Sequence, residues 1–135
     1  MLRHPGITWA LWDAADVLGD RAAADWAAAA FATLAERYDE DFHLFGDPLT
    51  DRLALCHGAA GVLAVADAFH RWARLSPAAV LGARLADHLT TRLPAALTPD
   101  RPRTSLLTGA PGALSALLTA TDDTLRDWLP CLGLR

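Results

Sequence analysis

Apolar residues recur at every third or fourth position along most of this chain, which is the spacing of a helix with one buried face. Alanine and leucine dominate and β-branched residues are few, which also favours helices over strands. The pattern predicts a first helix over 6–18, closed by Gly19, and a second helix over about 20–38, capped by Asp20. An acidic connector should follow over 39–54.

The second half of the chain shows the same periodicity, interrupted by proline and glycine. The predicted elements are a third helix over 58–73, a fourth from Ser76-Pro77 to just before Pro94, a linker over 98–103, a fifth helix from near Gly109, and a short tail over 124–135. With 135 residues, 53% of them hydrophobic, the chain can build one real core. The sequence therefore predicts an all-α fold in a single domain over residues 1–135.

Three helices begin with a similar glycine-marked segment. Gly6 and Gly61 are 55 residues apart, and Gly61 and Gly112 are 51 apart, with one further amphipathic helix in each interval. A period near 50 with two helices per unit is typical of a helical solenoid or toroid. The glycine-opened helices are small and apolar, so we expect them to run parallel as an inner layer facing one concave side. They cover 7–18, 61–70 and 112–118.

The adjacent residues Cys56 and His57 are the strongest candidates for chemistry. A thiol and an imidazole together suit a zinc ion. Neighbouring residues in a regular helix point about 100° apart, so binding of one metal by both requires an irregular backbone. Gly58 and Gly61 permit one. A buried cysteine beside a half-buried histidine is the alternative interpretation of the same pair.

Charge and composition exclude several classes of protein. The net charge is −4 and the 12 basic residues are all arginines, scattered along the chain, which does not favour nucleic-acid binding. No apolar run is long enough for a membrane span, and the N-terminus does not resemble a signal peptide. We therefore expect a cytoplasmic protein, in which Cys56 and Cys131 stay reduced rather than form a disulfide.

Beyond this, the chain resembles the C-terminal portion of the lanthionine synthetase C-like (LanC) cyclase family. The matching segments agree with that family in their residues, and also in their order and spacing along the chain. The segments are Leu55-Cys56-His57-Gly58-Ala59-Ala60-Gly61, Ser105-Leu106-Leu107-Thr108-Gly109-Ala110-Pro111-Gly112, and Pro5-Gly6-Ile7 with the helix that follows it.

The resemblance implies an α/α toroid with rings of inner and outer helices. It also implies a zinc ion, held by two cysteines and one histidine, that activates a peptide cysteine thiol for addition to dehydroalanine or dehydrobutyrine, closing a thioether ring. Cys56 and His57 match the second and third zinc ligands. The first ligand falls on Met1, and the family's upstream active-site residues have no counterpart here. We therefore expect a truncated or inactive cyclase whose zinc site is incomplete.

Several alternatives stay open. His4 is a candidate substitute for the missing ligand, whereas Cys131 is better interpreted as a buried small hydrophobe than as a ligand. The partner is expected to be a precursor peptide or a companion polypeptide, and a partial toroid should self-associate through its uncovered apolar flanks. A rival hypothesis is a non-catalytic helical-repeat module that binds a peptide or a protein. A carbohydrate-active toroid enzyme is disfavoured because the inner helix starts lack paired carboxylates.

Overall fold

The computed structural model describes residues 4–44, 49–98, 103–122 and 126–135, and these residues form helices without any strand. The predicted all-α fold is confirmed. The elements in chain order are α1 (Pro5–Leu18), α2 (Arg21–Glu36), α3 (Glu40–His43), α4 (Leu49–Leu53), α5 (Ala59–Ala73), α6 (Ser76–Ala96), α7 (Ala110–Thr121) and a short 3-10 helix, η1 (Leu129–Leu132).

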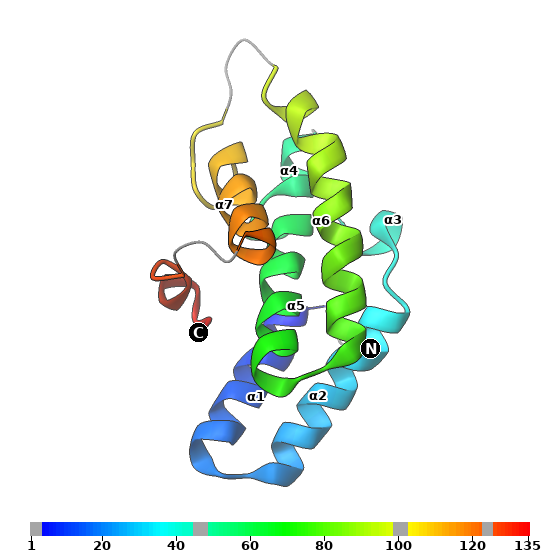
Figure 1. Ribbon diagram of the computed structural model, residues 1–135, viewed down its shortest axis with the longest axis vertical. Helices are drawn as coiled ribbons and strands as arrows, with labels where there is room; N and C mark the ends of the chain where they lie inside the picture. The colour runs from blue at the N-terminus through cyan, green and yellow to red at the C-terminus, as the bar shows by residue number, and fades with distance from the viewer. Residues whose placement is uncertain (1–3, 45–48, 99–102, 123–125) are drawn as a thin grey trace.

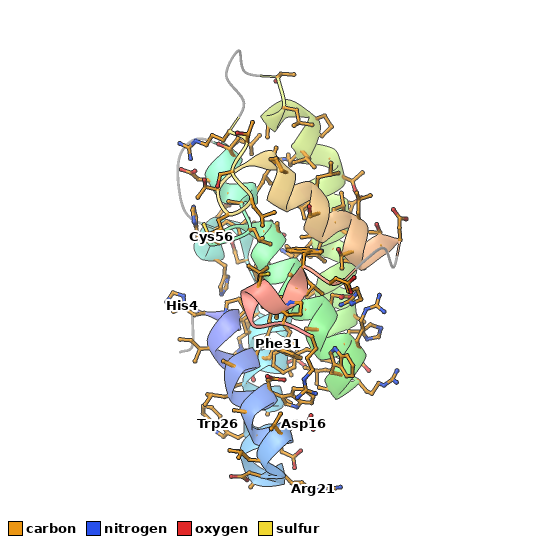
Figure 2. The ribbon with its side chains drawn as sticks, turned by 90° about the vertical axis from the view of Figure 1, so that its left-hand side faces the viewer. His4, Asp16, Arg21, Trp26, Phe31 and Cys56 are labelled. Carbon is orange, nitrogen blue, oxygen red and sulfur yellow. The ribbon has the colours of Figure 1, made fainter. Side chains whose placement is uncertain are left out.

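The long helices form two antiparallel hairpins and the beginning of a third. Helices α1 and α2 make the first hairpin, α5 and α6 the second, and α7 follows α6. In Figure 1, α1, α5 and α7 all run downward while α2 and α6 run upward. Helix α5 contacts α1, α6 and α7, so it lies at the centre of the row. The three glycine-opened helices thus run in the same general direction, although Figure 2 shows α7 inclined to α1. A shared concave side and a continuation into a toroid stay predictions.

Aromatic side chains join the two hairpins. Phe31 of α2 stacks on Phe69 of α5 with ring centroids 4.3 Å apart, and Trp9 of α1 meets the same Phe69 edge-on at 5.4 Å. All three side chains are almost completely buried, and Figure 2 shows Phe31 in the interior. Burial of rings of this size provides a large part of the hydrophobic free energy that holds the hairpins together.

Helix boundaries follow the local chemistry that the sequence indicated. Gly19 closes α1 with φ of +72°, a left-handed conformation that glycine adopts without strain. Asp20 caps α2, because its carboxylate accepts a hydrogen bond from the backbone N–H of Ala23 at 3.0 Å. The turn between the first two helices is therefore explained by two adjacent residues.

One predicted boundary was wrong, and one segment contains helices that were not predicted. The acidic connector includes the short helices α3 and α4. The fourth helix does not stop before Pro94 but continues to Ala96, with Pro94 in its last turn. Leu93 and Ala96 are buried in the core, so packing there overrides the cost of a proline near a helix end.

Arginines hold the acidic connector in place, through one contact with the second hairpin and one within the connector itself. Glu40 forms an ion pair with Arg84 of α6, and Asp41 pairs with Arg52 of α4 at 3.1 Å. Arg84 also donates a hydrogen bond to the backbone carbonyl oxygen of Tyr38 at 3.1 Å. These contacts fix the segment that leads from α2 to the Cys-His turn.

The turns that precede α5 and α7 have the same structure, 51 residues apart. Gly58 and Gly109 are the extended N-cap residues of the two helices, and each donates its N–H to the carbonyl oxygen four residues earlier at 2.9 Å. A Cβ atom on Gly61 would clash with the carbonyl oxygen of Leu55, and one on Gly112 would clash with the equivalent carbonyl oxygen of Leu106. The sequence repeat is therefore a repeat of backbone structure.

None of the helices in the described ranges combines the length and the apolar character that crossing a membrane requires.

Candidate metal centre

Cys56 and His57 lie in the irregular turn between α4 and α5, not inside a helix. The turn is anchored on both sides: the N–H of Cys56 donates to the carbonyl oxygen of Leu107 at 3.0 Å, and the N–H of Gly58 donates to that of Ala54 at 2.9 Å. A Cβ atom on Gly58 would lie 2.5 Å from the backbone nitrogen of Ala54, so only glycine fits there. The irregular backbone that the Cys-His pair requires is thus present.

The two side chains point toward each other. The Sγ atom of Cys56 lies 2.7 Å from Nδ1 of His57, and both residues are exposed. The alternative of a buried cysteine is therefore wrong. Two ligands of a tetrahedral zinc ion, with bonds of about 2.3 Å to sulfur and about 2.0 Å to nitrogen, are separated by roughly 3.6 Å. A small side-chain rotation that opens the pair by about 1 Å would reach this separation.

A cavity of about 590 Å³ adjoins the pair, between the N-terminal ends of α1 and α5. Apolar groups provide most of its walls. The polar or aromatic side chains that line it are those of His4, Trp9, Tyr38, His43, Cys56 and His57, and Leu107 and Leu132–Leu134 complete it. The chain therefore places a thiol and an imidazole at the edge of an apolar space large enough for a peptide side chain or a small ligand.

His4 lies in the wall of this cavity but not beside the Cys-His pair. It precedes α1, on the same side of the molecule as Cys56 (Figure 2). Within the described ranges no group of three His, Cys, Asp or Glu residues could hold a metal ion. Met1, on which the first zinc ligand of the LanC family falls, lies outside those ranges. Two of the expected ligands are thus together, and among the residues that the structure describes no third one lies beside them.

Tyr38 is a polar residue of the cavity that the sequence did not single out. It is 5% exposed, and no described group forms a hydrogen bond with its hydroxyl. Burial, with the nearby charge of Glu40, raises the pKa of Tyr38 above its usual range. The hydroxyl therefore stays protonated, and it is a hydrogen-bond donor without a partner among the described residues. A bound ligand or a water molecule that accepted this hydrogen bond would remove the free-energy cost of the buried donor.

The other histidines and the second cysteine lie elsewhere or have other contacts. His43 stacks on Tyr38 with ring centroids 4.9 Å apart, and its Nδ1 accepts a hydrogen bond from the N–H of Asp39. His70 and His88 lie on the faces of α5 and α6. Cys131, predicted to be buried, is exposed on η1, whereas the nearby Leu129 and Leu134 are buried in the core.

The C-terminal segment closes one wall of the cavity. The indole N–H of Trp9 donates to the carbonyl oxygen of Gly133 at 2.8 Å, and Leu134 is buried. Arg135 forms ion pairs with Asp13 at 2.5 Å and Asp16 at 2.8 Å on α1. No local pattern predicts this docking, which depends on contacts between residues more than 100 positions apart.

The chain matches no protein-family model, no curated protein and no solved structure.

Proposed function

We propose that this chain is a LanC-like segment in which Cys56 and His57 form the larger part of a zinc site for peptide thiols. The observation that carries the proposal is the pair itself: Sγ and Nδ1 are 2.7 Å apart in a glycine-fixed turn at the edge of the cavity. The repeated glycine turn, which the LanC resemblance implies, supports the same interpretation. The proposed reaction class is addition of a cysteine thiol to dehydroalanine or dehydrobutyrine.

In this proposal each described group has a separate task. Cys56 and His57 hold the metal, and zinc, when bound, lowers the pKa of a coordinated thiol. The apolar walls exclude water from the peptide. The protonated hydroxyl of Tyr38 donates a hydrogen bond to a polar group of the bound peptide. Because no third ligand lies beside the pair in the described part of the chain, we propose that the chain alone does not catalyse cyclisation.

The third ligand would come from another residue that lines the cavity or from another polypeptide. His4 lines the same cavity and is the candidate within this chain. A precursor peptide or a companion polypeptide is the alternative source. A cytosolic setting belongs to the proposal, because the thiols of Cys56 and Cys131 are both free and are kept reduced there.

A second candidate function is a helical-repeat module that binds a peptide without catalysis. The largely apolar cavity and the exposed leucines of α7 favour it. This candidate requires no metal, so zinc binding separates the two.

Protection of Cys56 from alkylation tests the proposal. The chain is treated with N-ethylmaleimide with and without added Zn²⁺, and the modified cysteines are located by mass spectrometry. We expect zinc to slow alkylation of Cys56 and to leave that of Cys131 unchanged, since both thiols are exposed but only Cys56 has a histidine beside it. Equal rates at Cys56 with and without zinc would favour the binding module.

A further inference from the structure

The last helix of the row, α7, has an uncovered apolar face. Pro111, Leu114 and Leu118 lie on one side of it, at intervals of three and four residues, and Leu107 precedes them in the turn. Leu107, Leu114 and Leu118 are 46%, 44% and 39% exposed. Isolated exposed leucines are common on proteins, but a continuous stripe along one helix indicates a contact surface.

The repeat shows what covers the equivalent face in the preceding unit. At the 51-residue offset, Leu114 corresponds to Leu63 of α5, and Leu118 corresponds to Asp67. Leu63 is 1% exposed, and the carboxylate of Asp67 pairs with Arg126 at 2.5 Å. Helices α6 and α7 pack against α5. A further helical hairpin is therefore the type of structure that fits on α7.

The opposite end of the row has an uncovered face of the same kind. On α1, Ile7, Leu11 and Leu18 are 46%, 45% and 81% exposed. With Ala14 they are spaced by four, three and four residues, so they line one side of the helix. Helix α1 runs in the same sense as α5 and α7 (Figure 1), and it belongs to a hairpin with α2.

We infer that copies of this chain associate head to tail, with the first hairpin of one copy covering α7 of the next. The repeat places a helical hairpin on α7, and the hairpin of α1 and α2 is a unit of this type. Its helix α1 runs in the same direction as α7 and carries an exposed apolar stripe. The contact joins two different surfaces, Leu114 and Leu118 on one copy and Ile7 and Leu11 on the other. Such a contact is heterologous, so it leads to rings or to open chains. It requires no bound zinc, although Ile7 also lines the cavity beside Cys56 and His57.

Two variants, each altering one surface, test the inference by sedimentation velocity and light scattering. Leu114→Glu with Leu118→Glu changes α7, and Ile7→Glu with Leu11→Glu changes α1. Val80→Glu is the matched control, since Val80 is 72% exposed on α6 and lies outside both surfaces. Circular dichroism confirms folding of each variant, and the glutamine versions replace any glutamate variant that does not fold.

We expect the wild type and Val80→Glu to form oligomers whose size increases with concentration, and each surface variant alone to be a monomer. A mixture of the two variants should form a dimer and nothing larger, because one intact surface of each kind remains. A wild type that is monomeric at every concentration would overturn the inference. So would an α1 variant that still forms dimers, because that result indicates a symmetric contact between α7 helices or another surface.

Discussion

The backbone N–H of Cys56 donates a hydrogen bond to the carbonyl oxygen of Leu107 at 3.0 Å, and the two residues hold equivalent places in turns 51 residues apart. Neighbouring units of the row therefore bring equivalent turn residues side by side. A metal site at these turns can take ligands from more than one unit. Cys56 and His57 come from one unit, and the adjacent unit places Leu107 beside them.

This relationship predicts that Leu107→Cys completes the zinc site. Leu107 lines the same cavity as the Cys-His pair, so a thiolate there becomes a third protein ligand. We expect zinc to bind roughly a hundredfold more tightly than in the wild type, or about 2.8 kcal/mol. Competition for zinc with a chromophoric chelator, under reducing conditions, measures the affinity of each protein for the metal. The control is Leu106→Cys, which is exposed but does not line the cavity, and an equal gain there would contradict the geometry.

The close approach at Gly112 predicts a large loss of stability for Gly112→Ala. The added methyl group would clash with the backbone carbonyl oxygen of Leu106, which cannot move without disturbing the turn. We expect the free energy of unfolding to fall by about 3 kcal/mol. Gly82→Ala is the control, because its nearest neighbour would be a Leu63 methyl group at 3.9 Å and the residue lies inside α6. In urea unfolding, the Gly82→Ala variant should have a free energy of unfolding about 0.5–1 kcal/mol higher than that of the wild type.

Arg135 should anchor the C-terminal segment. Its guanidinium pairs with Asp13 and Asp16 and lies 5.6 Å from the ring centroids of both Trp12 and Trp72. Partly exposed contacts of this kind contribute modestly, so Arg135→Ala should lower the free energy of unfolding by about 1 kcal/mol. The loss should be smaller in high salt, where ion pairs are screened. An unchanged midpoint of unfolding at low salt would show that Leu134 and the Trp9 hydrogen bond hold the segment alone.

His88 should make stability depend on pH. Burial lowers the pKa of His88, and the positive charges of Arg92, Arg52 and Arg84 act in the same direction, against Glu40. The side chain of residue 88 in the unfolded chain therefore binds a proton at a higher pH than in the folded protein. The contribution of neutral His88 to the free energy of unfolding is complete above about pH 6.5, and it is lost as the pH falls from there. The free energy of unfolding should decrease less steeply in His88→Gln than in the wild type over this range. Parallel curves would contradict the prediction.

Much of the fold could be predicted from the sequence, because its signals are local. Gly19 and Asp20 mark the first turn, and the glycines at a spacing of 51 mark the two equivalent turns. Helix formation beyond Pro94 could not be predicted, since it depends on the burial of Leu93 and Ala96 by distant parts of the chain. The same holds for α3 and α4, whose positions rest partly on ion pairs with Arg84 and Arg52.

The candidate site was predictable only in part. Adjacent donors beside glycine indicated Cys56 and His57, because the donor types and the turn are encoded within a few residues. The buried hydroxyl of Tyr38 was not predictable, since a tyrosine at the end of an amphipathic helix usually contributes to the core or the surface. The exposure of Cys131 was missed because thiols are usually buried, and nothing local shows that Leu134 takes the core position instead.

Direct measurement of zinc binding tests the central claim. Calorimetric titration and metal analysis after dialysis are compared for the wild type, Cys56→Ala, His57→Ala, His4→Ala and the control Cys131→Ala. We expect weak zinc binding by the wild type that dialysis removes, no binding by Cys56→Ala or His57→Ala, and unchanged binding by Cys131→Ala. Zinc that stays bound to the wild type and is lost in His4→Ala would identify a complete site and contradict the claim of an inactive segment. Equal binding by the wild type and Cys56→Ala would contradict the metal centre itself.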